Sequence, residues 1–166
     1  MTDIENLLTD DDFKTGFEPE VVPAGKYRMM LIKGAPRIKV SKSGNRYLTV
    51  RLVAKETQDG ERVNSKVIYH SIPFEGVNKN GNSNKGMFAG FFSALGLEKD
   101  QVKDLYANLL SEAPAPDVIG DREEVTLKLA GEVFDLGGRE LMASVKQDTY
   151  NEVTRNVVGS VWTLTE

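Results

Sequence analysis

The chain of 166 residues contains no cysteine and only one histidine, His70. The absence of cysteine excludes disulfides, thiolate metal sites and cysteine nucleophiles, and a chain without disulfides fits the reducing cytoplasm, where we expect this protein. A zinc site would have to be built almost entirely from carboxylates, which is unusual. We therefore expect no metal and no cofactor.

Several motifs of membrane proteins and enzymes are also missing. No run of about 18 apolar residues could span a membrane, and the N-terminal residues lack the basic and apolar regions of a signal peptide. There is no P-loop ending in Gly-Lys-Ser/Thr, and no nucleophile elbow accompanies His70. The carboxylates between 117 and 124 have Arg122 as their only cation, which favours a loop cap over a magnesium nuclease. We expect no membrane partner, no catalytic residue and no enzymatic activity.

Acidic residues are missing from one long stretch, residues 26–55, although the chain as a whole carries a net charge of −4. This stretch holds nine cations: Lys26, Arg28, Lys33, Arg37, Lys39, Lys42, Arg46, Arg51 and Lys55. Residues 1–20 form an acidic arm with a charge of −6, so the other 146 residues sum to +2. A basic stripe on a nearly neutral body, with a separate acidic arm, indicates a polyanionic partner.

The clearest strand pattern lies inside this basic stripe. Two sets of residues alternate there: Leu48, Val50, Leu52 and Ala54 on one side, and Tyr47, Thr49, Arg51 and Lys55 on the other. An extended strand directs alternate side chains to opposite faces, so we expect the first set to be core. The second set places a tyrosine ring between cations. Such a face suits single-stranded nucleic acid, whose phosphates are anionic and whose bases stack.

The order of the expected elements predicts a mainly β protein with helices. Strands are expected over 26–35, 37–41, 46–56, 62–72, 123–130 and 139–147, and helices over 86–95 and 99–110. Gly34 and Pro36 indicate a bend after the first segment, and the segments up to 72 form a meander. The last two strands are expected to form a second hairpin. Phe88, Phe91 and Phe92 follow helical spacing and are predicted to be core.

Three strands, helices and then a hairpin is the element order of an OB-fold, a five-stranded, partly open barrel. We expect one or two helices between its strands three and four. The domain organisation is then an acidic, partly disordered arm over 1–20, the OB-fold domain over 21–148, and an extension over 149–166. That extension either packs on the barrel or adds a strand to it. The fold binds oligonucleotides at strands two and three and the flanking loops, where the basic stripe and the Asn/Lys-rich loop 74–85 fall.

Short motifs carry a family resemblance over roughly residues 22–148. They are Pro23-Ala-Gly-Lys-Tyr-Arg at the start of a strand, Lys42-Ser-Gly-Asn before Tyr47-Leu-Thr-Val-Arg-Leu, and Phe92-Ser-Ala-Leu-Gly-Leu at the end of a helix. In these motifs the sequence resembles phage-encoded single-stranded DNA-binding proteins of replication and recombination modules. The resemblance implies an OB-fold, sequence-tolerant binding of single strands, and work beside replication or recombination enzymes. Many single-strand binders carry an acidic docking tail at the C-terminus, whereas here the acidic arm is N-terminal.

We therefore predict a non-enzymatic protein that coats and protects single-stranded DNA during phage DNA replication or recombination, in the cytoplasm of the host cell. The candidate contact residues are Arg37, Lys39, Lys42, Arg46, Tyr47, Arg51, Lys55, Tyr69, Phe74, Lys79 and Lys85. The acidic arm is expected to dock a replication or recombination enzyme and to weaken DNA binding modestly by competing for the basic face. A passive solubilising tail is the alternative for the arm, and homo-oligomer formation is left open. The alternative is a structural or interaction protein on a small β-barrel, such as a virion component or a host-factor inhibitor. Binding of RNA or duplex is also left open.

Overall fold

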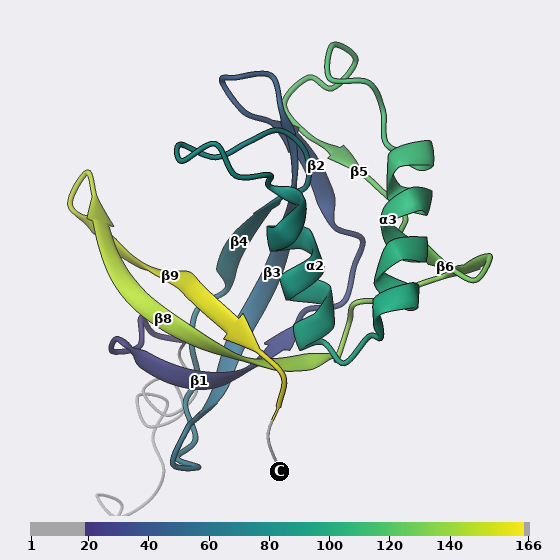
Figure 1. The fold of residues 1–166 in the computed structure, drawn as a ribbon. Coiled ribbons are helices and arrows are strands. Elements are labelled where there is room, and N and C mark those ends of the chain that lie inside the picture. Colours follow the sequence, from purple (N-terminus) through teal and green to yellow (C-terminus); the bar gives the residue numbers. More distant parts are fainter. Residues whose placement is uncertain (1–18, 165–166) are drawn as a thin grey trace, which may run out of the picture.

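The structure, a computed structural model, describes residues 19–164, which form two helices and two antiparallel sheets (Figure 1). The large sheet contains β1 (Gly25–Leu31), β2 (Arg37–Val40), β3 (Arg46–Thr57), β4 (Ile68–Pro73), β5 (Glu123–Glu124), β8 (Glu140–Tyr150) and β9 (Val153–Trp162). The small sheet pairs β6 (Lys128–Leu129) with β7 (Glu132–Val133), and the helices are α2 (Lys85–Ala94) and α3 (Lys99–Glu112). The prediction of a mainly β protein with helices is confirmed. Of the acidic arm expected over 1–20, residues 1–18 lie outside the described range.

β3 is the centre of the large sheet and pairs with three strands. Its residues 46–49 pair with β2, residues 47–52 pair with β4 on the other side, and residues 52–57 pair with β1. β1 and β2 are therefore two segments of one bent strand. The bend lies where the sequence predicts it, at Gly34, whose φ of +128° is a conformation that L side chains rarely adopt.

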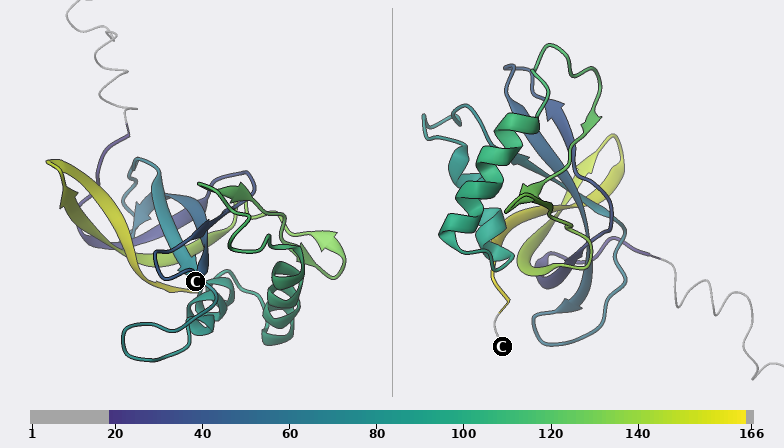
Figure 2. Two further views of the ribbon diagram at one scale, coloured as in Figure 1. Left: turned by 90° about the horizontal axis from the view of Figure 1, so that it is seen from above. Right: turned by 90° about the vertical axis from the view of Figure 1, so that its right-hand side faces the viewer.

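Hydrogen bonds do not close the large sheet into a barrel. Its path runs β5-β2-β3-β1-β8-β9, with β4 added at β3, and within residues 19–164 no backbone pairing joins β4 to β9. These two strands nevertheless lie against each other, and α2 packs against both. The expected five-stranded barrel is thus not confirmed, since the seven strands form a curved sheet with both helices on one side of it (Figure 2).

The expected hairpin between 123–130 and 139–147 is wrong. β5 pairs with β2, β6 turns back onto β7, and β8 lies between β1 and β9. Alternation along the chain predicts a strand but carries no information on its partner, which is why this pairing could not be derived. The true hairpin joins β8 to β9, and its turn residues Asn151 and Glu152 have φ of +50° and +67°, as in the turns that favour two-residue hairpin loops.

The strand expected over 62–72 is shorter in the structure, because residues before β4 pair with the start of the described chain. Glu20 forms a parallel bridge with Ser65, and the buried Ser65 hydroxyl accepts a hydrogen bond of 2.7 Å from the backbone N–H of Ala54. Val22 is anchored nearby, since the side chain of the buried Asn156 bonds both its N–H and its carbonyl. Residues 20–22 are therefore held firmly on the sheet.

The core follows the predicted pattern. Leu48, Leu52 and Ala54 are fully buried and Val50 is 2% exposed, as the alternation of β3 predicts. The phenylalanines of α2 (Phe88, Phe91, Phe92) are buried against one another, which confirms that they are core. Among residues 19–164, no helix is long and apolar enough to cross a lipid bilayer, and no group of three or more acidic or histidine side chains is placed to hold a metal ion.

His70 lies on the core side of β4, with its ring 5.8 Å from that of Phe91. Burial lowers the pKa of His70 from its usual 6.5 to about 4, because the imidazolium form loses its hydration. The folded protein therefore holds this ring in the neutral form at neutral pH.

We predict that His70 makes the free energy of unfolding fall by about 2 kcal/mol between pH 7 and pH 5. Its folded-state pKa lies below the unfolded value, so the stabilisation is complete above pH 6.5 and declines as the pH falls from 6.5 toward 4. Urea unfolding at several pH values measures the effect. His70→Gln removes the titrating group and should give a flatter profile over this range. Parallel profiles for the two proteins would contradict the assignment.

Candidate nucleic-acid interface

The face of β2, β3 and β4 that points away from the core gathers cations and polar side chains. Directly opposite residues in an antiparallel pair share a face, so the β3 register decides which side chains meet. Arg37 and Ser71 lie opposite Thr49, Lys39 lies opposite Tyr47, and Tyr69 lies opposite Arg51. We call this surface the outer face: Arg37, Lys39, Tyr47, Thr49, Arg51, Tyr69 and Ser71.

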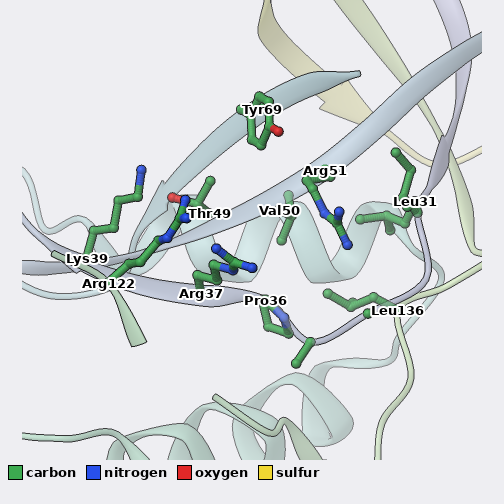
Figure 3. A pocket seen from close by; sticks show the side chains of 13 residues that line it. Leu31, Pro36, Arg37, Lys39, Thr49, Val50, Arg51, Tyr69, Arg122 and Leu136 are labelled. Carbon is green, nitrogen blue, oxygen red and sulfur yellow. The ribbon is translucent and has the colours of Figure 1, made fainter. Parts of the chain in front are cut away.

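A cavity of about 260 Å³ opens on the outer face beside the bend between β1 and β2 (Figure 3). Its cationic lining residues are Arg37, Lys39, Arg51 and Arg122, and no acidic residue among 19–164 lines it. Figure 3 shows the guanidinium groups of Arg37 and Arg51 reaching into the same space, above walls that include Leu31, Pro36 and Leu136. We call it the cationic pocket.

A larger groove of about 820 Å³ runs between β4 and β9. It shares four lining residues with the cationic pocket: Lys39, Thr49, Tyr69 and Arg122. It adds Arg155 from β9 and, within the described part of the chain, no acidic residue lines it. Because the pocket and the β4–β9 groove share a wall, they form one continuous positively charged surface.

Tyr69 stands where the pocket and the groove meet. Its side chain is 65% exposed, and it makes no ring contact or side-chain hydrogen bond within residues 19–164. The sequence left the direction of this side chain ambiguous, and the pairing with Arg51 resolves it. A large aromatic ring held in solvent beside cations is suited to stacking on a base.

The cations of the pocket have few internal partners. The Nη2 of Arg51 donates a 3.0 Å hydrogen bond to the carbonyl of Lys33, which orients the guanidinium without neutralising it. Gly34 allows this approach, since a Cβ there would lie 2.8 Å from Arg51 Nη2. Arg37 faces the exposed carboxylate of Glu124 at 4.0 Å, a distance at which an exposed pair contributes little. Most of the positive charge is thus available to a ligand.

The hydroxyl of Thr49 is an unusual feature of the same surface. Its Oγ1 is buried and has no hydrogen-bond partner within the described part of the chain. A buried polar atom without a partner costs about 1–3 kcal/mol, so threonine at this position is not explained by stability alone.

Arg46 is not free to bind a ligand, contrary to the sequence prediction. Its guanidinium forms hydrogen bonds of 2.8–3.1 Å with the carboxylate of Glu75, and it donates a further bond to the carbonyl of Pro114. The side chains of Arg46 and Glu75 are only 14% and 23% exposed. The hydrogen bonds from Arg46 lower the pKa of Glu75, which keeps this carboxylate ionised. Arg46 is part of an internal ion pair.

Phe74 is also unavailable, because it is fully buried in the core. Its carbonyl accepts a 2.6 Å hydrogen bond from the hydroxyl of Tyr106, and the guanidinium of Arg46 lies 5.7 Å from its ring centroid. The sequence suggested a stacking residue here, whereas the ring is packed among the buried residues of the core.

The other candidates lie around the outer face. Tyr47 is half-buried and lines a separate cavity of about 310 Å³ between the turn 41–45 and the loop 74–84. Lys42 is exposed in that turn, Lys79 is exposed in that loop, and Lys85 is exposed at the start of α2. Lys55 is exposed on β3, four residues beyond Arg51, about 13 Å away along the strand.

Sequence reasoning missed Arg122 and Arg155. Arg122 is flanked by Asp121 and Glu123, so its local charge pattern is acidic, and Arg155 lies in a segment without a clear prediction. Only the pairing of β5 with β2 and the position of β9 beside β4 bring them to the outer face. No local signal could have found them.

No family model and no curated protein matches this sequence. The functional argument therefore depends on the geometry and charge of the outer face.

We predict that Arg46→Ala lowers the free energy of unfolding by about 3 kcal/mol, because it leaves the Glu75 carboxylate half-buried without its partner. Arg51→Ala should change it by about 1 kcal/mol or less, since this side chain is exposed and makes one hydrogen bond to the backbone. Urea unfolding of the two variants gives both values. Equal losses of unfolding free energy would contradict the assignment of Arg46 as a structural residue and of Arg51 as a residue free to bind a ligand.

Proposed function

We propose that the protein binds single-stranded DNA with little sequence preference and coats it during phage DNA replication or recombination. The observation that carries this proposal is the continuous surface of the cationic pocket and the β4–β9 groove, where Tyr69 is exposed and which none of the acidic residues that the structure describes lines. Cations meet phosphates whatever the sequence, and an aromatic ring stacks on any base. Both features support sequence-tolerant binding.

Several features favour single strands over duplex. A base inside a duplex is stacked on its neighbours, so Tyr69 can cover its face only in a single strand. The exposed side of α3 carries Asp100, Asp104 and Glu112 beside Lys99 and Lys103, so its charged side chains give no excess of positive charge for a DNA groove. An open sheet with aromatic residues accepts ribose as well as deoxyribose, so RNA is a necessary competitor in any test.

We further propose that the curved sheet is an open variant of the five-stranded OB barrel. The path β4-β3-β1-β8-β9, with β2 continuing β1 and both helices between β4 and β8 in the chain, supports this assignment. Strands four and five of the barrel are then β8 and β9, instead of the segments over 123–130 and 139–147. The β4–β9 groove lies at the seam that a closed barrel would lack.

The acidic arm is proposed to dock a replication or recombination enzyme in the host-cell cytoplasm. Its support is compositional: seven acidic residues among 1–20 are mixed with sparse apolar residues, a pattern typical of docking segments. Residues 20–22 are hydrogen-bonded to the sheet, so a partner held by the arm would stay close to the bound strand.

A structural or interaction protein remains the competing proposal. One observation favours it: Tyr150 and Val153, at the turn end of the β8–β9 hairpin, are 69% and 65% exposed. Exposed apolar side chains at a protruding hairpin are suited to a protein contact. This feature is separate from the outer face, so the two proposals can be tested with different variants.

We predict that a gel-shift assay will rank single-stranded DNA above duplex of the same sequence, with RNA as the third probe. If three to five of the surface cations contact phosphates, the plot of log affinity against log salt should have a slope of about −2 to −4. An affinity for single strands that is independent of salt would contradict the phosphate contacts. Preference for duplex would contradict the role of the ring.

Tyr69→Ala should weaken binding to single-stranded DNA by about 1–3 kcal/mol, the usual value of a base–aromatic stack. Tyr150→Ala is the matched control, because Tyr150 is exposed to a similar extent but lines neither the pocket nor the groove. Fluorescence anisotropy with a labelled oligonucleotide measures both. If the two variants lose equal affinity, or neither loses any, the stacking role of Tyr69 is wrong.

A further inference from the structure

The cationic pocket differs from the rest of the outer face in its convergent charge. Arg37 on β2 and Arg51 on β3 are diagonal neighbours, because Arg37 lies opposite Thr49, two residues before Arg51. Their guanidinium groups reach into one small cavity that no carboxylate of residues 19–164 lines (Figure 3). Two like charges that share a cavity repel each other, and an anion between them would remove that repulsion.

The walls of the pocket strengthen this effect. Leu31, Pro36, Val50 and Leu136 contribute apolar surface beneath the cations. Apolar walls keep the local dielectric low and focus the field of the charges that border them. An anion in this position therefore interacts more strongly with the guanidinium groups than it would on an open surface.

Arg51 is also held in place before any ligand arrives. Arg51 uses one N–H for the carbonyl of Lys33, which leaves its other donors for the cavity. Gly34 has a positive φ, and a Cβ at this position would lie 2.8 Å from Arg51 Nη2. A residue without a side chain therefore leaves room for this guanidinium at the bend. Planar guanidinium forks match the oxygen atoms of phosphate in a two-bond geometry.

From this geometry we propose that the cationic pocket binds a single phosphate group between Arg37 and Arg51. Its volume of about 260 Å³, against about 820 Å³ for the adjoining groove, suits one phosphate rather than a length of strand. The inference rests on the proposed function and deepens it. The phosphate is supplied either by the backbone of a strand that lies in the β4–β9 groove or by the end of such a strand.

The test titrates the full chain with pyrophosphate or inorganic phosphate and measures their binding by ³¹P NMR and calorimetry. Arg37→Gln and Arg51→Gln should each weaken pyrophosphate binding about tenfold or more, since each removes a charge-assisted pair of hydrogen bonds. Lys103→Gln, an exposed position of α3 with the same change in net charge, is the control and should bind as the unaltered protein does. Arg51→Lys keeps the charge but loses the planar guanidinium fork. Its affinity for pyrophosphate should therefore lie between that of the unaltered protein and that of Arg51→Gln.

Thermal unfolding of each variant separates lost binding from lost folding, and Arg37→Gln provides an independent reading if Arg51→Gln is unstable. The proposal is overturned if pyrophosphate does not bind, or if it binds equally to Arg37→Gln, Arg51→Gln and Lys103→Gln. Equal weakening by all three would also overturn it, because general charge would then explain the binding.

Oligonucleotides with a 5′-phosphate, a 3′-phosphate or neither identify the source of the group. A gain from one end-phosphate that disappears in Arg51→Gln assigns the pocket to a strand end. Equal affinity for the three oligonucleotides, lowered about equally by Arg51→Gln, assigns it to the backbone, and both results support the pocket.

The two proposals fail in different ways. Pyrophosphate binding that depends on Arg37 and Arg51, without any binding of single strands, would retain the pocket and refute the proposed function. Normal binding of single strands by Arg37→Gln and Arg51→Gln would refute the pocket and retain the function.

Discussion

The structure depends on one strand, β3, whose two sets of side chains serve two different purposes. Leu48, Val50 and Leu52 are buried in the core, while Thr49 and Arg51 point to the outer face. Because the side-chain period of a strand is two residues, a slip of one residue in its pairing would exchange the two faces. Pairing with β1, β2 and β4 holds the register, so the same hydrogen bonds that stabilise the fold also assemble the cationic surface.

Charge is divided in a similar way between structure and ligand. Arg28 forms ion pairs with Glu56 and Glu140 across β1, β3 and β8, and Arg46 forms one with Glu75. These arginines of the basic stripe have carboxylate partners supplied by distant parts of the chain. Arg51, by contrast, is held by a backbone carbonyl, so its charge remains uncompensated at the cationic pocket. Of the nine cations in the basic stripe, Arg28 and Arg46 are therefore engaged within the protein and are not available as ligand contacts.

Sequence reasoning found the part of the candidate site that lies on one strand and its neighbour. Arg51 follows from alternation, because local geometry alone directs it away from the apolar residues of β3, and Arg37 and Lys39 follow from their place in the basic stripe. Arg122 and Arg155 could not be found this way, since they come from β5–β2 pairing and from β9 beside β4. Phe74 was assigned wrongly for the same reason, because its burial depends on packing against core residues from other parts of the chain.

The sequence by itself determined the secondary structure of β3, α2 and α3, the core phenylalanines, the bend at Gly34 and the position of the basic stripe. These properties depend on periodicity, backbone preference and local composition, which are readable along the chain. Only the tertiary structure decided that β8 pairs with β1 and β9, that Arg46 is internal, and that Tyr69 stands between pocket and groove. Each of those depends on contacts between residues far apart in sequence, and alternation specifies a face but not a partner.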